Sequence, residues 1–164
     1  MITNLEAKAI MRDAGRRDAL VLQERSENMS GTELYAEDSI IPLFTEAVKV
    51  KNMLERKAGQ ADGFVCKSSA GRVVRLIQNY DSNNYLHADG TPWEPEELPA
   101  QYRFVWSKNP ARALPFIAIP ESYYMTGDCC LNEAGQPMRS KININVWSPD
   151  TNPEFWEAAS EEVS

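Results

Sequence analysis

An internal repeat in the second part of the chain constrains the fold more than any other sequence feature. The segment Gly63–Gly71 aligns without gaps with Gly127–Gly135, with Gly, Cys, Ala and Gly at matching places, and each segment continues as Gly-x-x-x-Arg. Further along, Trp93–Tyr102 and Trp147–Trp156 share the spacing aromatic-x-Pro-x-x-x-Pro-x-x-aromatic. The two matches differ in separation by ten residues, which a polar loop insertion at 79–91 can hold. Repetition at this many turn-forming positions predicts two related structural units.

Each repeat predicts a β-hairpin followed by a tail that carries aromatic residues and prolines. In the first repeat, β-prone runs at 64–66 and 73–77 flank a Ser-Ser-Ala-Gly turn, and in the second, runs at 128–131 and 138–146 flank Asn-Glu-Ala-Gly-Gln-Pro. A unit of about 40 residues is near the lower limit for a hydrophobic core, so the large aromatics of the tail are expected to cover the hairpin. We therefore expect an α+β fold, with an N-terminal helical segment followed by two small three-stranded antiparallel β modules.

The N-terminal part of the chain favours helix. Residues 3–28 contain no proline, and Thr3 and Glu6 have the spacing of a capping box. The apolar stripe of this segment is imperfect, and an isolated helix of this length is marginal in water, so it is expected to pack on the next element or on copies of itself. A shorter helix is expected from Thr32 towards Ile41, ending at Pro42, while residues 43–55 fit a strand or a helix equally.

These patterns divide the chain into four predicted regions. They are a helical N-terminal oligomerisation region at 1–58, a first β module at 60–108, a second β module at 120–158 and an acidic tail at 159–164. The expected state is a homo-oligomer, with a trimer favoured, although the stripe does not specify a number of copies.

Charge and hydropathy narrow the class of partner. The chain has 24 acidic and 17 basic residues, a net charge of −7, which disfavours non-specific binding to nucleic acid. No apolar stretch approaches the roughly 20 residues of a membrane-spanning helix, so no membrane partner is expected. The first residues lack the apolar segment of a signal peptide, which predicts synthesis in a reducing cytoplasm.

The three cysteines and the single histidine do not suggest catalytic or metal chemistry. Cys66, Cys129 and Cys130 are odd in number and two are adjacent, so we expect buried thiols in strands in place of a disulfide framework. With no CxxC pair, neither a metal site nor a cofactor is predicted. His87 lies in a polar turn-like stretch without a nucleophile motif, which favours a loop histidine over a catalytic base. The chain is expected not to be an enzyme and to have no catalytic residues.

The second repeat resembles a known family of glycan-binding domains. Its Tyr124-Met-Thr-Gly-Asp128 segment and its tail Asn145-Val-Trp-Ser-Pro-Asp-Thr-Asn-Pro-Glu-Phe-Trp156 are similar to the small carbohydrate-binding modules of families 5 and 12, the chitin-binding type 3 fold. The tail looks like the form found in tail-associated proteins of phages and prophages of Gram-positive bacteria. The segment Leu98-Pro-Ala-Gln-Tyr102 matches the end of a first module, with tyrosine in place of tryptophan.

The resemblance implies a function as well as a fold. It implies a virion protein, made in the cytoplasm of the host bacterium and associated with a tail fibre or baseplate. Such a protein would bind glycan without catalysis, with cell-surface polysaccharide and other virion proteins as partners. The alternative is a purely structural decoration or adaptor protein, whose modules contact neighbouring subunits.

One departure from the family affects the predicted binding residues. Chitin-binding members carry an exposed Trp-Trp pair on the strand after their second tyrosine, but the corresponding segment here, Lys141–Asn145, has no aromatic and Met138 replaces the tyrosine. Glycan binding is therefore assigned to the remaining aromatics, by stacking on a sugar ring. They are Trp93, Trp147, Tyr123, Tyr124, Tyr102 and Trp156. The competing interpretation is that these side chains fill the core, and it is stronger for Tyr102 and Trp156 than for the other two tail aromatics.

Overall fold

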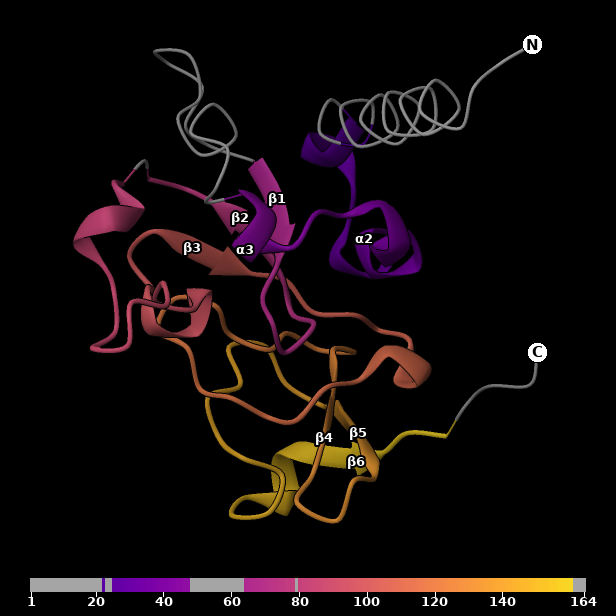
Figure 1. Cartoon of the computed structure of the whole chain (residues 1–164). Coiled ribbons are helices and arrows are strands. Elements are labelled where there is room, and N and C mark those ends of the chain that lie inside the picture. The colour runs from indigo at the N-terminus through magenta and orange to yellow at the C-terminus, as the bar shows by residue number, and fades with distance from the viewer. Residues whose placement is uncertain (1–21, 23–24, 48–63, 79, 161–164) are drawn as a thin grey trace, which may run out of the picture.

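The computed structural model describes residues 22, 25–47, 64–78 and 80–160 of the chain (Figure 1). The predicted helix at 3–28 lies outside the described residues except for its last few positions, and so do residues 48–55 and most of the acidic tail. The helices are α2 (Gly31–Ala36) and α3 (Phe44–Ala47). The strands are β1 (Phe64–Lys67), β2 (Val73–Leu76), β3 (Tyr102–Phe104), β4 (Cys129–Leu131), β5 (Pro137–Ser140) and β6 (Trp156–Ala158).

The described strands form two antiparallel sheets of three strands each, in the orders β1-β2-β3 and β4-β5-β6. Their registers are equivalent: Cys66 lies opposite Val74 as Cys130 lies opposite Met138, and the first aromatic of each third strand pairs with the last residue of the second strand. The prediction of two small three-stranded antiparallel sheets is therefore confirmed.

The two hairpin turns have the same geometry. Gly71 and Gly135 have φ values of 86° and 79°, in the left-handed region that residues with a Cβ atom rarely adopt. Their N–H groups donate to the carbonyls of Ser68 and Asn132, each at 2.9 Å. Because an added Cβ would meet nothing within 4 Å at either position, the glycines are needed for backbone conformation and not for space.

The structural repeat begins earlier than the sequence repeat. Each unit starts with a short 3-10 helix, at Asp38–Ile40 and at Pro110–Arg112. The chain that follows each helix lies along the first strand of the sheet in parallel orientation: the N–H of Lys67 donates to the carbonyl of Pro42 at 2.9 Å, and the N–H of Leu131 donates to the carbonyl of Leu114 at 2.8 Å. Each sheet therefore has one edge covered by the segment that precedes it in its own unit.

The first sheet is buried on both faces. Side chains of a strand alternate between faces, so Val65 and Val73 pack with Leu34 and Tyr35 of α2 on one side. The other face belongs to a larger core that both sheets share. Its buried residues include Phe64, Leu76, Tyr102 and Phe104 from the first sheet, Cys130 and Trp156 from the second, and Trp106, Ile119 and Tyr124 from the connection between them. The two sheets therefore have a common interior, and the domain boundaries given above stay predictions.

A buried arginine of the first unit also contacts the second unit. The guanidinium of Arg72, in the first hairpin, contacts the Glu96 carboxylate at 3.1 Å and donates to the Pro115 carbonyl at 3.0 Å. The side chains of Arg72 and Glu96 are only 10% and 14% exposed. Loss of either partner would leave a buried charge without its counter-ion, which is destabilising. Because Arg72 contacts both Glu96 and the Pro115 carbonyl, it holds the tail of the first unit against the second unit.

The strand expected at 138–146 is shorter than its sequence suggests, because β5 ends at Ser140. The Ser140 hydroxyl donates to the Ile142 carbonyl at 2.7 Å, which turns the chain out of the sheet. Ile144 then takes a φ of 52°, an uncommon conformation for a β-branched residue. The segment that carries the aromatic pair in the family is consequently a loop here.

The helix expected from Thr32 begins one residue earlier and ends sooner. Ser30 is its N-cap and forms a capping box with Glu33, and α2 ends at Ala36 before the 3-10 helix at Asp38–Ile40. No helix among the described residues is long and apolar enough to span a membrane.

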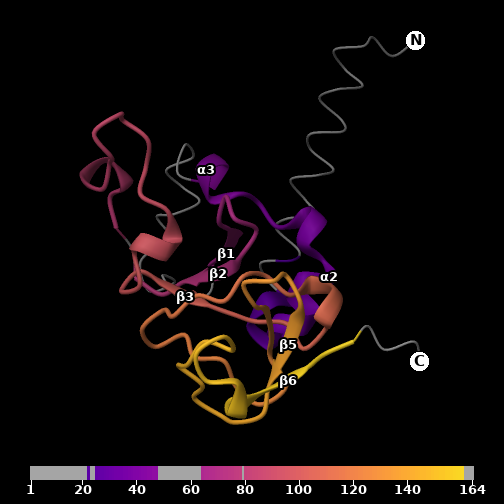
Figure 2. The ribbon, with the colours of Figure 1, turned by 90° about the horizontal axis from the view of Figure 1, so that it is seen from below.

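The longer connection of the first unit projects from the molecule. Figures 1 and 2, which differ by a quarter turn, both show residues 80–100 (rose to coral) extending from the first sheet on the side away from α2. The equivalent connection in the second unit, between β5 and β6, is ten residues shorter. The insertion predicted at 79–91 therefore lies in this projecting loop.

Candidate functional site

The structure divides the predicted tail aromatics into an exposed and a buried pair. Trp93 and Trp147, the first aromatics of the two tails, are 36% and 41% exposed, whereas Tyr102 and Trp156, the last ones, are 0% and 4% exposed. A buried side chain offers no face to a ligand. Trp93 and Trp147 are therefore the tail aromatics that a sugar ring can reach, while Tyr102 and Trp156 belong to the shared core. The assignment of glycan binding to any of them stays a prediction.

Trp93 is held by the projecting loop. Its backbone N–H donates to the Tyr85 carbonyl at 2.8 Å. The Tyr85 ring meets the Trp93 indole edge to face, with 5.6 Å between the ring centroids. The imidazole of His87 lies near the indole at 6.3 Å with an interplanar angle of 24°. The tryptophan is therefore supported by two neighbouring rings and keeps part of its surface in contact with water.

His87 is oriented by hydrogen bonds at both ring nitrogens. Nε2 lies 2.9 Å from the Glu97 carboxylate, and Nδ1 lies 3.0 Å from the Thr91 hydroxyl, which itself donates to Asp89 at 2.6 Å. The Glu97 carboxylate raises the pKa of His87, because it stabilises the imidazolium, and the pKa of Glu97 is lowered in turn. This chain of polar contacts fixes the imidazole beside Trp93.

Trp147 is fixed through its backbone. Its N–H donates to Asn145 Oδ1 at 3.2 Å, and its carbonyl accepts from the Trp156 indole at 2.8 Å. Asn145 is 1% exposed and its amide also donates to the Ser140 hydroxyl at 2.9 Å. The ring of Phe155 lies 4.8 Å from the Trp147 ring with a tilt of 38°. An exposed tryptophan is thus held in place by buried polar groups.

The adjacent tyrosines Tyr123 and Tyr124 have different surroundings. Tyr124 is 1% exposed and stacks on Trp106, with ring centroids 4.2 Å apart and an angle of 12°. Its burial raises the pKa of its hydroxyl. Tyr123 is half-buried and lines an open cavity of about 230 Å³ with Ile117, Pro120 and Val146. Of the two predicted tyrosines, only Tyr123 is partly accessible, while Tyr124 is a core residue.

Tyr102 has a structural partner. Its hydroxyl lies 2.7 Å from that of Tyr80, and the two rings meet edge to face at 5.7 Å. Desolvation raises the pKa of Tyr80 as well as that of Tyr102. This hydroxyl pair anchors the start of the projecting loop over β3.

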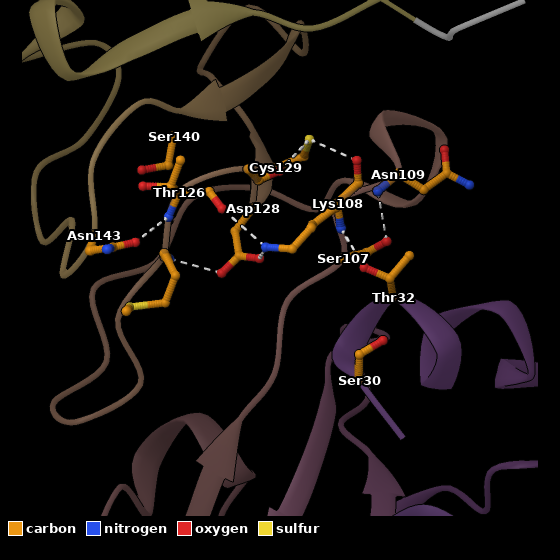
Figure 3. A network of polar contacts seen from close by, with 12 residues as sticks. Ser30, Thr32, Ser107, Lys108, Asn109, Thr126, Asp128, Cys129, Ser140 and Asn143 are labelled. Atoms are coloured by element: carbon orange, nitrogen blue, oxygen red, sulfur yellow. Dashed lines mark hydrogen bonds and ion pairs between the residues drawn. The ribbon is translucent and has the colours of Figure 1, made fainter. Parts of the chain in front are cut away.

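The Gly-Asp motif that is part of the family resemblance has a structural role in this chain (Figure 3). Asp128 is buried; its carboxylate accepts from the Met125 N–H at 2.8 Å and faces Lys108 Nζ at 3.4 Å. Lys108 also donates from Nζ to the Thr126 carbonyl at 3.0 Å and from its backbone N–H to the Thr32 hydroxyl at 2.9 Å. The motif therefore connects the turn before β4 to α2.

The three cysteines are free and buried, in β1 and β4. Burial raises the pKa of the thiols of Cys66 and Cys130, which makes both poor nucleophiles. The prediction of buried thiols in strands is confirmed. Among the described residues, no three His, Cys, Asp or Glu side chains gather in a way that would hold a metal ion.

The contacts of Tyr85 and His87 with Trp93, and the core position of Trp106, are not predicted from the sequence. Tyr85 and His87 lie in the insertion, which has no counterpart in the second repeat, so alignment of the repeats does not mark them. Trp106 lies just beyond the first repeat, yet its ring connects Phe104 to Tyr124 in the core. The signal that could have identified Trp106 is its place at the alternate, core-facing register after Tyr102 and Phe104.

In comparisons with known proteins, the chain matches no family model, no curated protein and no solved structure. The resemblance to carbohydrate-binding modules stays a prediction drawn from the sequence motifs.

Proposed function

We propose that the chain is a non-enzymatic phage structural protein, associated with a tail fibre or baseplate of the virion, that presents two carbohydrate-binding-like modules to the host cell surface. The observation that carries the proposal is the exposure of Trp93 and Trp147 at equivalent positions of a structural repeat. Exposed tryptophans on fixed backbones supply the flat apolar face on which a sugar ring stacks. The partner in this proposal is a cell-surface polysaccharide.

The proposal requires several weak contacts to act together. One stacked sugar ring contributes little to the binding free energy. Once one module has bound a polysaccharide, however, the effective concentration of sugar near the second module of the same chain is raised. A homo-oligomer formed through the N-terminal region, with a trimer favoured, would multiply this effect. Binding is therefore expected to be weak for one module and strong for the assembled particle.

The first prediction concerns retention on cell walls. Purified full-length protein is mixed with cell walls of candidate bacterial hosts, and the bound fraction is measured by sedimentation. Trp93→Ala and Trp147→Ala should each weaken binding about tenfold, because each removes one stacking contact, and the double variant should not bind. Leu86→Ala is the matched control, since Leu86 is an exposed apolar residue of the loop that carries Trp93, at 45% exposure.

Two results would contradict the glycan-binding proposal. One is that the native oligomer is not retained by any candidate wall. The other is that the double variant binds as well as the wild type, which would show that retention does not use the tryptophans. The folded state of each variant is checked by circular dichroism.

A second candidate function is a decoration or adaptor protein whose modules contact neighbouring virion subunits. The observation that favours it is a set of exposed apolar side chains in the second module: Met125, Ile144 and Val146 are 41%, 56% and 42% exposed. Met125 and Ile144 are in contact, since the Ile144 N–H lies 3.4 Å from Met125 Sδ. Neighbouring exposed apolar side chains such as Met125 and Ile144 can mark a protein contact. A virion density map that places both tryptophans in subunit contacts would support this function over glycan binding.

A further inference from the structure

The backbone groups along the outer edge of β6 have no partner among the described residues. The Lys141 N–H donates to the Phe155 carbonyl and the Ala159 N–H donates to the Pro137 carbonyl, both at 2.9 Å. The backbone groups of the odd-numbered residues of 155–159 therefore point towards β5. In an antiparallel sheet the residues between them point their N–H and C=O groups the other way. Ala158 therefore directs its N–H outward, and no residue in the described part of the chain accepts a hydrogen bond from it.

The equivalent edge of the first sheet is covered. Phe104 has the register position in β3 that Ala158 has in β6, and its outward N–H donates to the Ser122 hydroxyl at 2.8 Å. The segment that covers this edge is the turn at Glu121 and Ser122, whose carbonyls also accept from Arg103 at 3.2 Å and from the Trp106 indole at 3.1 Å. The described residues of the two units thus differ: they cover this edge in the first sheet and leave it uncovered in the second.

The charge of Glu157 indicates which kind of segment could pair with the outer edge of β6. Glu157 in β6 has the same register position as Arg103 in β3. The first sheet therefore has a cationic side chain at this position, and the second sheet has a carboxylate. Arg139 lies opposite Glu157 on β5, but the two form no ion pair. The exposed Glu157 carboxylate thus forms no ion pair with a described residue, and it could accept a cationic side chain on the outer side.

A second copy of the chain fits this edge poorly. Two β6 strands paired antiparallel about Glu157 would place the two Glu157 carboxylates directly opposite one another, and like charges at facing positions destabilise a sheet. Pairing about Ala158 would instead set each Glu157 opposite Ala159, which gives the carboxylate no cationic partner. We propose instead that the outer edge of β6 binds an extended segment of another protein that carries Lys or Arg beside Glu157. Backbone hydrogen bonds to an exposed sheet edge are a common mode of peptide recognition.

The experiment uses the full-length protein and two probes, a synthetic pentapeptide of alternating threonine and lysine and its counterpart with glutamate in place of lysine. Amide signals of the isotope-labelled protein are followed by NMR during titration. The lysine peptide should shift and protect the Ala158 amide, and it should bind at least about threefold more tightly than the glutamate peptide, the size expected of an exposed ion pair. Glu157→Lys should reverse this order.

Ala158→Pro separates edge pairing from simple charge attraction. Proline removes the outward N–H and is tolerated at sheet edges, so the variant should fold and lose most binding of the lysine peptide, measured by fluorescence anisotropy of the labelled probe. Trp93→Ala and Trp147→Ala should leave peptide binding unchanged, which keeps this test apart from that of glycan binding.

Three outcomes would overturn the proposal. The first is that neither peptide affects the Ala158 amide. The second is that the Ala158 amide is already protected from exchange in the free monomer, which would show that the chain's own residues cover the edge. The third is a wild-type dimer that Ala158→Pro dissociates, which would make a second copy the occupant.

Discussion

His87 shows how a single side chain in an inserted loop can organise the surface next to it. Its imidazole is bound at both nitrogens and lies beside Trp93, the exposed tryptophan of the first unit. Because the Glu97 carboxylate favours the charged imidazole, the folded loop stabilises protonated His87 relative to the unfolded chain. This contribution to stability is fully present below a pH of about 6.5 and is lost as the pH rises through the higher folded pKa.

The hydrogen bond from His87 to Glu97 predicts a raised pKa for the imidazole. NMR of the imidazole signals should give a pKa above about 6.5, the usual value for histidine. Glu97→Gln should lower that pKa towards the usual value, because it removes the carboxylate that stabilises the imidazolium. Glu94→Gln is the matched control, since the Glu94 carboxylate accepts from Ser69 and not from His87. An unchanged titration in the Glu97 variant would show that the hydrogen bond does not form in solution.

The two hairpins are the elements that the sequence predicts best. Their signal is local: a glycine stands at a fixed place between two β-prone runs. The turn at that place needs a left-handed backbone conformation, which glycine adopts readily. The end of β5 at Ser140 is not predictable in the same way, because it depends on the Ser140 hydroxyl, which donates to the Ile142 carbonyl two residues further on. The segments that cover β1 and β4 are also invisible in the sequence, since they use backbone carbonyls that any residue type provides.

At the scale of these elements, matched substitutions should have matched effects. Gly71→Ala and Gly135→Ala should each lower the free energy of unfolding by about 1 kcal/mol, through backbone strain alone, because nothing lies near the added methyl group. Asparagine tolerates the left-handed conformation, so Gly71→Asn and Gly135→Asn should cost less. Urea denaturation measures all four. A much larger effect in one hairpin than in the other would contradict the equivalence of the two turns.

For the molecule as a whole, a continuous series of aromatic rings joins the two sheets. Phe104 packs on Trp106, Trp106 stacks on Tyr124, and Tyr124 meets Trp156 edge to face at 5.5 Å. The repeat in the sequence suggests two independent modules, each with its own small core. The shared interior depends instead on contacts between residues far apart in the chain, which periodicity and turn signals do not encode.

A variant at the centre of this series should affect both sheets. Tyr124→Ala is expected to lower the free energy of unfolding by about 3–5 kcal/mol, the usual effect of removing a buried aromatic ring, and to leave one cooperative transition. Amide signals from β2 and from β5 should be lost at the same urea concentration. Tyr123→Ala, at the half-buried neighbour, should have a smaller effect. Loss of the β5 signals while β2 stays folded would show that the units are separate.

The candidate site was predictable to the extent that it lies in the repeat. Matching spacing marks Trp93 and Trp147 as equivalent, and the stronger expectation of core burial for Tyr102 and Trp156 is confirmed. Exposure follows from the third strand, which turns Tyr102 and Trp156 inward as the first residues of β3 and β6. The surroundings of Trp93 come from an insertion that the repeat cannot describe.

Arg72 gives the molecule a path for mechanical load. Its guanidinium joins Glu96, close to Trp93 in the sequence, to the Pro115 carbonyl in the segment that lies along β4. Tension applied to the projecting loop therefore reaches the second sheet through side-chain contacts as well as along the covalent backbone. A pulling force applied to the first unit would therefore be distributed over both units.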